Sequence, residues 1–280
     1  MDLLLNTIML EPNRWTADHI LSWPLVDLLE LIDEAGFKDL ELWGYHVDRM
    51  DNDAVADLAA ALAGRSMRAL AIGAYPAFHK EGSEEEEEAS RLERVVCAGA
   101  VLGASIFKIF PGRVASAQAD GAIRRRTVER LEALADRVGA EGMALTLETH
   151  GGTLCDTLDS THRLLDELAS HSNVGICYQP YGDDDTGDAI AAFDALGEHI
   201  RHLHVQNRDA NRTMTLLEDG DWTDYARFLA HARAAGFDGA LCIEFTAGIV
   251  PSEGASFDPT MVLGNAILDR RFIESHWISA

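Results

Sequence analysis

The chain is poor in basic residues, with 23 lysines and arginines against 47 aspartates and glutamates, which gives a formal net charge of -24 at pH 7. Binding to nucleic acid depends on lysines and arginines that displace counterions from phosphates, so this balance argues against a nucleic-acid partner. It does not exclude a small anionic substrate in a local basic pocket, because net charge describes the whole surface and not one site.

Cysteines are also few. The chain has four, Cys97, Cys155, Cys177 and Cys242. They form no CxxC pair, so we expect reduced, mostly buried thiols in a cytoplasmic protein. No apolar run approaches the ~18 residues that a membrane span requires, and we expect no membrane partner. The first 15 residues lack a basic start and their apolar run breaks at Asn6, so we expect a first strand there and not a signal peptide.

Two phosphate-binding signatures are missing: no GxGxxG follows the first apolar run, and the chain contains no GxxxxGK[ST]. Their absence disfavours an open, doubly wound nucleotide-binding sheet. For 280 residues with 47% hydrophobic content, the alternative is one closed α/β barrel, a fold of ~250 residues.

The order of apolar runs favours the barrel. Segments typical of strands occur at 3–8, 38–43, 67–73, 105–112, 143–152, 174–179, 199–206 and 239–245. Their ends recur at intervals of roughly 30 to 40 residues, the length of a strand, loop and helix unit. Eight such units predict a (β/α)₈ barrel that spans residues 1–280 as a single domain.

Helical patterns fill the intervals. Ser22 is expected to cap a helix entered through Pro24, and Ser83 with Glu86 matches a capping box at the start of another helix. Asp221 is expected as the N-cap of the helix before the last strand. Further helices are predicted at 52–63, 117–140 and 258–277.

Four predicted strand ends carry side chains that can bind a metal: Glu148, Gln179, His204 and Glu244. In a barrel the C-terminal strand ends share one mouth, so these residues are expected to converge. Two carboxylates, an imidazole and an amide oxygen suit Mn²⁺, Mg²⁺ or Co²⁺, and also Zn²⁺. Taken singly, a Glu or His at such a position is better explained by a hydrogen-bonded structural role.

Five segments in fixed order carry a resemblance to a known family: ELW (41–43), LTLETH (145–150), GICYQPY (175–181), HLHVQNRD (202–209) and AAGFDGALCIEF (234–245). Together they resemble the xylose-isomerase-like TIM-barrel superfamily of sugar isomerases and epimerases. That superfamily includes ketose 3-epimerases, hydroxypyruvate isomerase and inosose dehydratase.

The resemblance implies a divalent metal held by Glu148, His204 and Glu244, with Mn²⁺ expected and Mg²⁺, Co²⁺ or Zn²⁺ as alternatives. Gln179 stands where the family usually has Asp, and Gly182 where it often has His. An amide can coordinate through its oxygen, but the lost negative charge weakens binding of a divalent ion. A ligand-binding or partner subunit without turnover is therefore kept as an alternative.

The resemblance implies that Glu148 and Glu244 act as base and acid on either side of a carbohydrate-type substrate. The expected activity is isomerisation or epimerisation through proton abstraction next to a carbonyl. Loss of a β-hydroxyl after the same first step would make the enzyme a lyase or dehydratase. Endonuclease relatives are disfavoured, because this acidic chain lacks a basic DNA-binding face.

Four further residues are expected to contact substrate: Lys108, His150, Arg208 and Trp43. Each has an alternative: Lys108 could extend past the barrel rim, and His150 could support a metal ligand through a hydrogen bond. Arg208 could form a surface salt bridge, and Trp43 could serve only in packing. Other aromatic residues that could line the mouth are Tyr75, Phe110, Tyr178 and Tyr181. Barrels of this type often associate, and a homodimer and a homotetramer are both left open.

Overall fold

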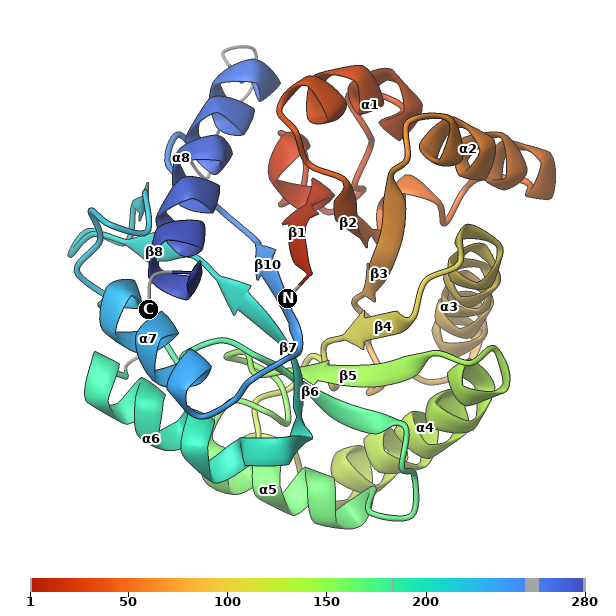
Figure 1. The fold of residues 1–280 in the computed structure, drawn as a ribbon. Helices are drawn as coiled ribbons and strands as arrows, with labels where there is room; N and C mark the ends of the chain where they lie inside the picture. Colours follow the sequence, from red (N-terminus) through yellow and green to blue (C-terminus); the bar gives the residue numbers. More distant parts are fainter. Residues whose placement is uncertain (1, 183, 250–256, 279–280) are drawn as a thin grey trace.

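Eight parallel strands close into a barrel at the centre of the molecule (Figure 1). The computed structural model describes residues 2–182, 184–249 and 257–278, and the barrel lies within them. In spatial order the strands are β1, β10, β7, β6, β5, β4, β3 and β2, and β2 pairs with β1. Their bounds are β1 (Leu3–Asn6), β2 (Asp39–Trp43), β3 (Arg68–Ala74), β4 (Ile106–Ile109), β5 (Ala144–Glu148), β6 (Val174–Tyr178), β7 (Ile200–Val205) and β10 (Ala240–Ile243). The predicted (β/α)₈ barrel is confirmed.

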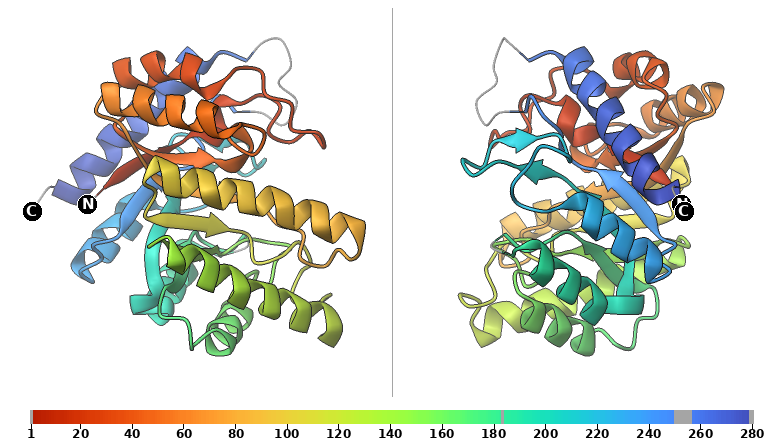
Figure 2. Two further views of the ribbon diagram at one scale, coloured as in Figure 1. Left: turned by 90° about the vertical axis from the view of Figure 1, so that its right-hand side faces the viewer. Right: turned by 60° about the vertical axis from the view of Figure 1, so that its left-hand side comes forward.

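A ring of helices surrounds the strands, and side views show them stacked around the barrel (Figure 2). The helices are α1 (Leu25–Glu34), α2 (Asn52–Gly64), α3 (Ser83–Leu102), α4 (Gly121–Ala140), α5 (Leu158–Glu167), α6 (Thr186–Leu196), α7 (Tyr225–Ala234) and α8 (Pro259–Ile278). Short 3₁₀ turns are η1 (Thr7–Leu10), η2 (Gly44–His46) and η3 (Gly197–His199), and a small hairpin joins β8 (Asn207–Arg208) to β9 (Met214–Thr215). Among the described residues, no helix is long and apolar enough to cross a membrane.

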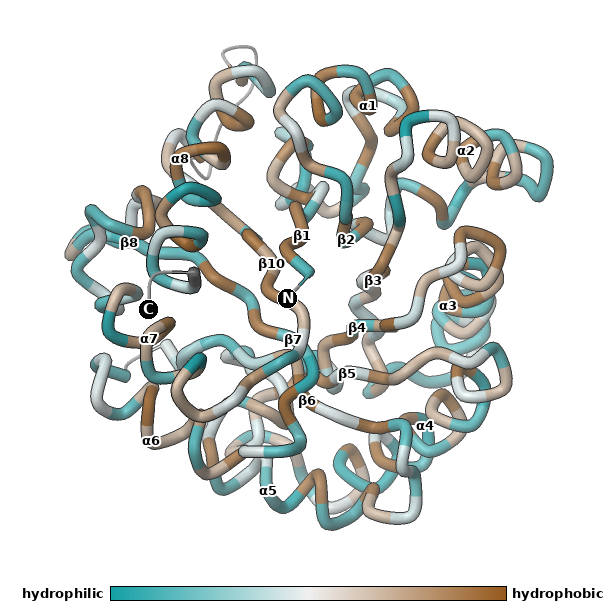
Figure 3. The backbone as a smooth tube through the Cα atoms, in the orientation of Figure 1, coloured by the Kyte–Doolittle hydropathy of each residue, from teal (hydrophilic) through white to brown (hydrophobic). Residues whose placement is uncertain are grey.

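The strands are buried on both faces, as expected when helices cover a parallel sheet. Their outward side chains join the helices in one large hydrophobic core, while Leu4, Ala71, Ile106, Ala240 and Cys242 form a separate apolar cluster. The strands are mostly hydrophobic and the outer helices alternate between hydrophilic and hydrophobic turns (Figure 3). The apolar cluster is followed along the strands by polar side chains, which form the site described below.

The predicted last helix is confirmed as α8, which packs against α7, α1 and β10 and so closes the outer ring. The Arg270 guanidinium donates hydrogen bonds to the carbonyls of Ala35 (3.0 Å) and Gly36 (2.9 Å) at the end of α1. Gly36 has a φ of 78°, a conformation that other residues adopt only with strain. The first and last parts of the chain are thereby joined.

Three predicted helix caps are wrong. Ser22 donates to the Glu11 carboxylate instead, and α1 starts after Pro24 without a side-chain cap. Helix α3 follows Gly82 and also lacks a capping side chain, so the Ser83 capping box does not form.

The third wrong cap is Asp221, because Asp224 caps α7 by accepting a hydrogen bond from the Arg227 amide (3.0 Å). Helix α4 begins at Gly121 and not near 117, because Asp120 accepts from the amides of Ala122 and Ile123, both at 2.8 Å.

These caps give a prediction with an internal control. Asp120→Ala removes the acceptor for two otherwise unpaired amides and should lower the free energy of unfolding by about 1 kcal/mol. Ser83→Ala should leave it unchanged, because Ser83 makes no capping bond. Urea denaturation of both variants tests this, and equal midpoints for the two would contradict the cap assignment.

Candidate active site

The four predicted metal ligands lie at the C-terminal ends of four neighbouring strands and are all buried. Glu148 ends β5, Gln179 follows β6, His204 lies near the end of β7, and Glu244 follows β10. The His204 Nδ1 atom is 3.7 Å from Glu148 Oε1 and 3.4 Å from Glu244 Oε2. One ligating atom from each of these three residues lies within 4.8 Å of the others. The structure therefore brings the predicted carboxylates and imidazole together.

Gln179 joins this group through its amide nitrogen. Its Nε2 atom donates to Glu148 Oε1 (2.9 Å), and its Oε1 atom accepts from Gln206 Nε2 (2.7 Å). Gln206 Nε2 also donates to Glu244 Oε2 (2.7 Å). The two amides thus link the carboxylates of Glu148 and Glu244. A 180° rotation of the Gln179 amide would turn its oxygen toward Glu148 and His204, and this interchange of oxygen and nitrogen leaves the shape of the side chain unchanged.

Lys108 lies inside the barrel and not at the mouth or past the rim, where it was expected. Its ammonium is 2.6 Å from Glu148 Oε2 and 3.6 Å from Glu41 Oε1, and it donates to the Tyr75 hydroxyl (3.2 Å). A Cβ atom on Gly73 would lie 3.1 Å from Lys108 Cε and 3.3 Å from Nζ. The absence of a side chain at Gly73 therefore makes room for this lysine.

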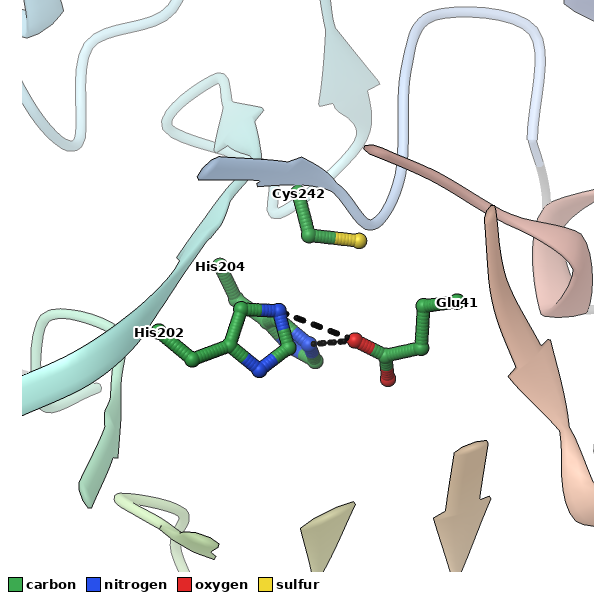
Figure 4. A group of neighbouring side chains, drawn as sticks. All are labelled: Glu41, His202, His204 and Cys242. Carbon is green, nitrogen blue, oxygen red and sulfur yellow. Dashed lines mark hydrogen bonds and ion pairs between the residues drawn. The ribbon is translucent and has the colours of Figure 1, made fainter. Parts of the chain in front are cut away.

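A second group of ligating side chains lies beside the first and shares His204 with it. Glu41 from β2 points at the two imidazoles of β7, and Cys242 from β10 lies close by (Figure 4). Glu41 Oε2 is 2.9 Å from His204 Nε2 and 3.1 Å from His202 Nε2. Its other oxygen accepts from Asn6 Nδ2 (3.0 Å). Every member of this group is buried.

Glu41 fixes the orientation of His204. A carboxylate only accepts hydrogen bonds, so His204 must donate its Nε2–H to Glu41. In the neutral ring this leaves a lone pair on Nδ1, which has no hydrogen-bond partner and lies between Glu148 and Glu244. A histidine that donates one ring N–H to a carboxylate while the other nitrogen stays open is the usual arrangement at a metal.

Charge keeps the deep carboxylates ionised. Burial tends to raise the pKa of Glu148, but Lys108 and then His204 outweigh it and hold this pKa at about 2. For Glu41, burial is again opposed by the charges of His204, His202 and Lys108, so its pKa lies well below the usual value.

The imidazoles and the lysine shift in the opposite direction. Burial would lower the pKa of His204, yet neighbouring Cys177, Glu41, Glu244 and Glu148 raise it well above its usual value. The pKa of Lys108 is likewise raised, because Glu148 and other nearby anionic groups outweigh its burial.

A count of formal charges shows that the site suits a divalent ion. Glu41, Glu148 and Glu244 contribute three negative charges against one positive charge on Lys108. The raised pKa values of His202 and His204 mean that protonated imidazoles offset this excess at neutral pH, and a divalent ion that replaced the proton on His204 Nδ1 would take over part of that role. Uncompensated buried charge is costly, so the buried carboxylates favour such an ion. The residues that would hold it are Glu148, His204 and Glu244.

A cavity of about 390 Å³ reaches this group at Glu244. Glu244 lines the cavity, whereas Glu148 is fully buried beneath. Two of the expected substrate contacts, Trp43 and His150, also line it. The His150 ring stacks on Phe110 with 4.3 Å between centroids, and its Nδ1 donates to the Gly151 carbonyl (2.7 Å).

Of the remaining candidates, Arg208, Tyr178 and Tyr181 are not among the residues that line the cavity. Arg208 donates to the Gly182 carbonyl (2.6 Å) and sits 3.9 Å over the Trp222 ring. Tyr178 donates to the carbonyl of Ala189 in α6 (2.7 Å), so its side chain packs outside the barrel. Tyr75 and Phe110 do line the cavity, as expected. Tyr181 exchanges a hydrogen bond with Thr161 of α5 (2.9 Å).

Three residues of the site were not predicted: Glu41, His202 and Gln206. Each is two positions from a residue already singled out, namely Trp43 or His204. Because side chains alternate along a strand, His202, His204 and Gln206 share one face, and this spacing could have identified the two missed members of β7 and its extension. For Glu41, the signal was a carboxylate within the otherwise apolar run LELW.

Comparison with known proteins identifies the family. The model of the family described as xylose isomerase-like TIM barrel matches residues 29–258. A 3-dehydroshikimate dehydratase of Bacillus anthracis is 25% identical over 185 residues, which cover 65% of this chain and 65% of that protein, slightly less than two thirds of its length.

Solved structures show the same fold. The probable 3-DHS dehydratase AsbF of Bacillus anthracis superimposes with a TM-score of 0.74 at 20% identity and 98% coverage of both chains. The D-psicose 3-epimerase of Clostridium cellulolyticum H10, solved with D-tagatose, gives a TM-score of 0.74 at 16% identity and 99% coverage of both chains.

The space around Lys108 gives a second prediction. Gly73→Ala would push a methyl group against the buried ammonium and should lower the free energy of unfolding by about 1–3 kcal/mol. Gly64→Ala is the control, because nothing lies within 4 Å of its added Cβ at the end of α2. That change should be neutral or stabilise the protein by up to about 1 kcal/mol. Denaturation curves decide the matter, and an unaffected Gly73→Ala variant would show that Lys108 does not depend on this space.

Proposed function

The chain belongs to the xylose isomerase-like TIM-barrel family, and from this premise we propose that it is a metal-dependent isomerase or epimerase of a sugar, keto-sugar or polyol derivative. The reaction would begin with removal of a proton from a carbon next to a carbonyl. The observation that carries the proposal is the convergence of Glu148 and Glu244 on His204 Nδ1 at the floor of a cavity.

The metal is proposed to be held by Glu148, His204 and Glu244, with Gln179 as a fourth ligand if its amide oxygen faces the ion. Mn²⁺ is the preferred ion and Mg²⁺, Co²⁺ or Zn²⁺ are alternatives, because carboxylate and imidazole ligands accept all four. When bound, such an ion polarises a carbonyl and so makes the neighbouring C–H more acidic.

The two carboxylates divide the proton transfer. Glu148 is held ionised beside Lys108, so it is unprotonated at neutral pH, but the same contact makes it a weak base, and removal of the proton therefore depends on a polarised neighbouring carbonyl. Glu244 reaches the cavity and accepts a hydrogen bond from Gln206, which fixes its direction. If the carboxylates face opposite sides of the substrate, one removes a proton and the other returns one. Return to the same carbon gives epimerisation, and return to the neighbouring carbon gives isomerisation.

A second candidate function is dehydration, which the relative named as a 3-dehydroshikimate dehydratase favours. The first step would be the same abstraction of a proton next to a carbonyl. A hydroxyl on the β-carbon would then leave as water after protonation by one of the carboxylates. Product analysis separates the two functions, because dehydration changes the mass of the product and epimerisation does not.

A ligand-binding subunit without turnover is the remaining alternative, suggested by Gln179 and Gly182. The hydrogen bonds of Gln179 favour an enzyme over this alternative. Its amide bridges Glu148 and Gln206 within the site, so the loss of a carboxylate at position 179 has left an ordered group of side chains in place.

Proton abstraction can be measured without knowledge of the final product. In D₂O with Mn²⁺, the enzyme should exchange the C–H next to the carbonyl of an accepted ketose or cyclic hydroxyketone for deuterium, and EDTA should stop the exchange. Glu148→Gln and Glu244→Gln should each slow it by at least about 100-fold, because an amide cannot accept the proton. Proton NMR and mass spectrometry report exchange and loss of water together.

The control is Glu129→Gln, which removes an exposed carboxylate from α4 and should exchange at the wild-type rate. Near-normal exchange in either active-site variant would exclude the two-carboxylate mechanism. Unchanged folding of the variants must be shown by circular dichroism.

A further inference from the structure

The cavity over the site is lined mainly by aromatic rings, with polar groups from Thr16, His19 and His150 among them. The rings come from the ends of five strands and the loops that follow them: Trp15, Trp43, Tyr45, Tyr75, Phe110 and Phe245. Among the described residues that line the cavity, Glu244 is the one carboxylate, and it belongs to the proposed metal site. The charged groups that remain are two guanidinium groups, Arg14 and Arg113.

Arg113 has no acidic partner among the described residues. Its Nε donates to the backbone carbonyl of Tyr75 (3.4 Å), and its guanidinium carbon lies 5.8 Å from the Tyr75 ring centroid and 5.6 Å from that of Phe110. The side chain is exposed on the cavity side, so its terminal N–H groups can reach a ligand.

The loop that carries Arg113 is fixed before any ligand binds. This loop joins β4 to α4, and the Leu154 amide donates to the Pro111 carbonyl at its start (3.2 Å). Farther along, the Ser116 amide donates to Asp156 Oδ2 (2.9 Å). Gly112 turns the chain with a φ of 87°. Because both sides of the loop are tied to the segment after β5, the direction of Arg113 is set in advance, which lowers the entropy cost of binding.

We propose that the substrate carries a carboxylate that pairs with Arg113, while its carbonyl and hydroxyl groups face Glu244 and His204. This inference rests on the proposed function, because it places the reacting end of the substrate at that site. A negatively charged chain repels anions at long range, so an anionic substrate needs a local positive group at the cavity. The aromatic walls would contact the carbon skeleton of a compact ring.

A carboxylate fits these surroundings better than a phosphate. The planar guanidinium fork matches a planar carboxylate with two parallel hydrogen bonds. Phosphates are usually held by several backbone amides at a helix N-terminus. Here Arg113, in the loop after β4, lies against the rings of Tyr75 and Phe110. Helix α4 begins only at Gly121, and its first amides are already bonded to Asp120.

Three probes test the charge: quinate, which is a hydroxylated ring with a carboxylate, its uncharged methyl ester of nearly the same shape, and ribose 5-phosphate as a phosphate-bearing sugar. Their affinities would be measured by isothermal titration calorimetry on the full chain, with and without Mn²⁺. The variants are Arg113→Gln, Arg113→Lys, and Arg125→Gln, which removes an equally exposed charge from α4 as the control.

Wild-type protein and the Arg125→Gln variant should bind quinate at least about tenfold more tightly than its ester, as expected for a hydrogen-bonded charge pair. Arg113→Gln should remove this preference while leaving binding of the ester unchanged, and Arg113→Lys should restore part of it. All variants should melt at the wild-type temperature, since Arg113 makes no ion pair in the described structure.

Equal binding of quinate and its ester by wild-type protein, or no binding of either, would overturn the proposal. A preference for ribose 5-phosphate that depends on Arg113 would overturn it as well and would indicate a phosphate. These binding results do not depend on whether the protein catalyses the proposed proton abstraction. Failure of deuterium exchange with intact, Arg113-dependent binding of quinate would instead contradict the proposed function alone.

Discussion

The candidate active site depends on the hydrogen bond between His204 and Glu41, two residues buried inside the barrel. Glu41 accepts the Nε2–H, so the open Nδ1 lies between the carboxylates of Glu148 and Glu244, of which Glu244 lines the cavity. Asn6 holds the second oxygen of Glu41, and Lys108 lies 3.6 Å from it. Without this carboxylate the imidazole could rotate or exchange its proton, and the open nitrogen would no longer be fixed between Glu148 and Glu244.

This arrangement carries a cost that explains the other buried polar residues. Several carboxylates inside a barrel destabilise it unless each is paired, and removal of one partner from a buried ion pair typically costs about 3–5 kcal/mol. Lys108 supplies one permanent positive charge, and Gly73 supplies the space that this lysine occupies. The amides of Gln179 and Gln206 satisfy the remaining carboxylate oxygens at the mouth. A divalent ion would complete the charge balance of the same group.

Most of the fold could be predicted from the sequence, because the barrel repeats one unit whose buried strands and intervening helices leave clear local patterns. The convergence of Glu148, His204 and Glu244 was predictable for the same reason, since barrel topology places strand ends at one mouth. The helix caps were harder. Ser22 and Ser83 have suitable chemistry, but whether a hydroxyl caps a helix depends on competing partners such as Glu11, which tertiary structure alone brings near. Lys108 was misplaced because no local pattern reveals that Gly73, on a neighbouring strand, leaves room for it.

The central claim is that His204 Nδ1, directed by Glu41, forms one metal site with Glu148 and Glu244. Crystals grown with Mn²⁺ test it through the anomalous scattering of the ion. The account predicts one strong peak about 2.0–2.4 Å from His204 Nδ1 and from one oxygen of each of these two carboxylates. A peak among Glu41, His202 and Cys242, or no peak at saturating Mn²⁺, would contradict it.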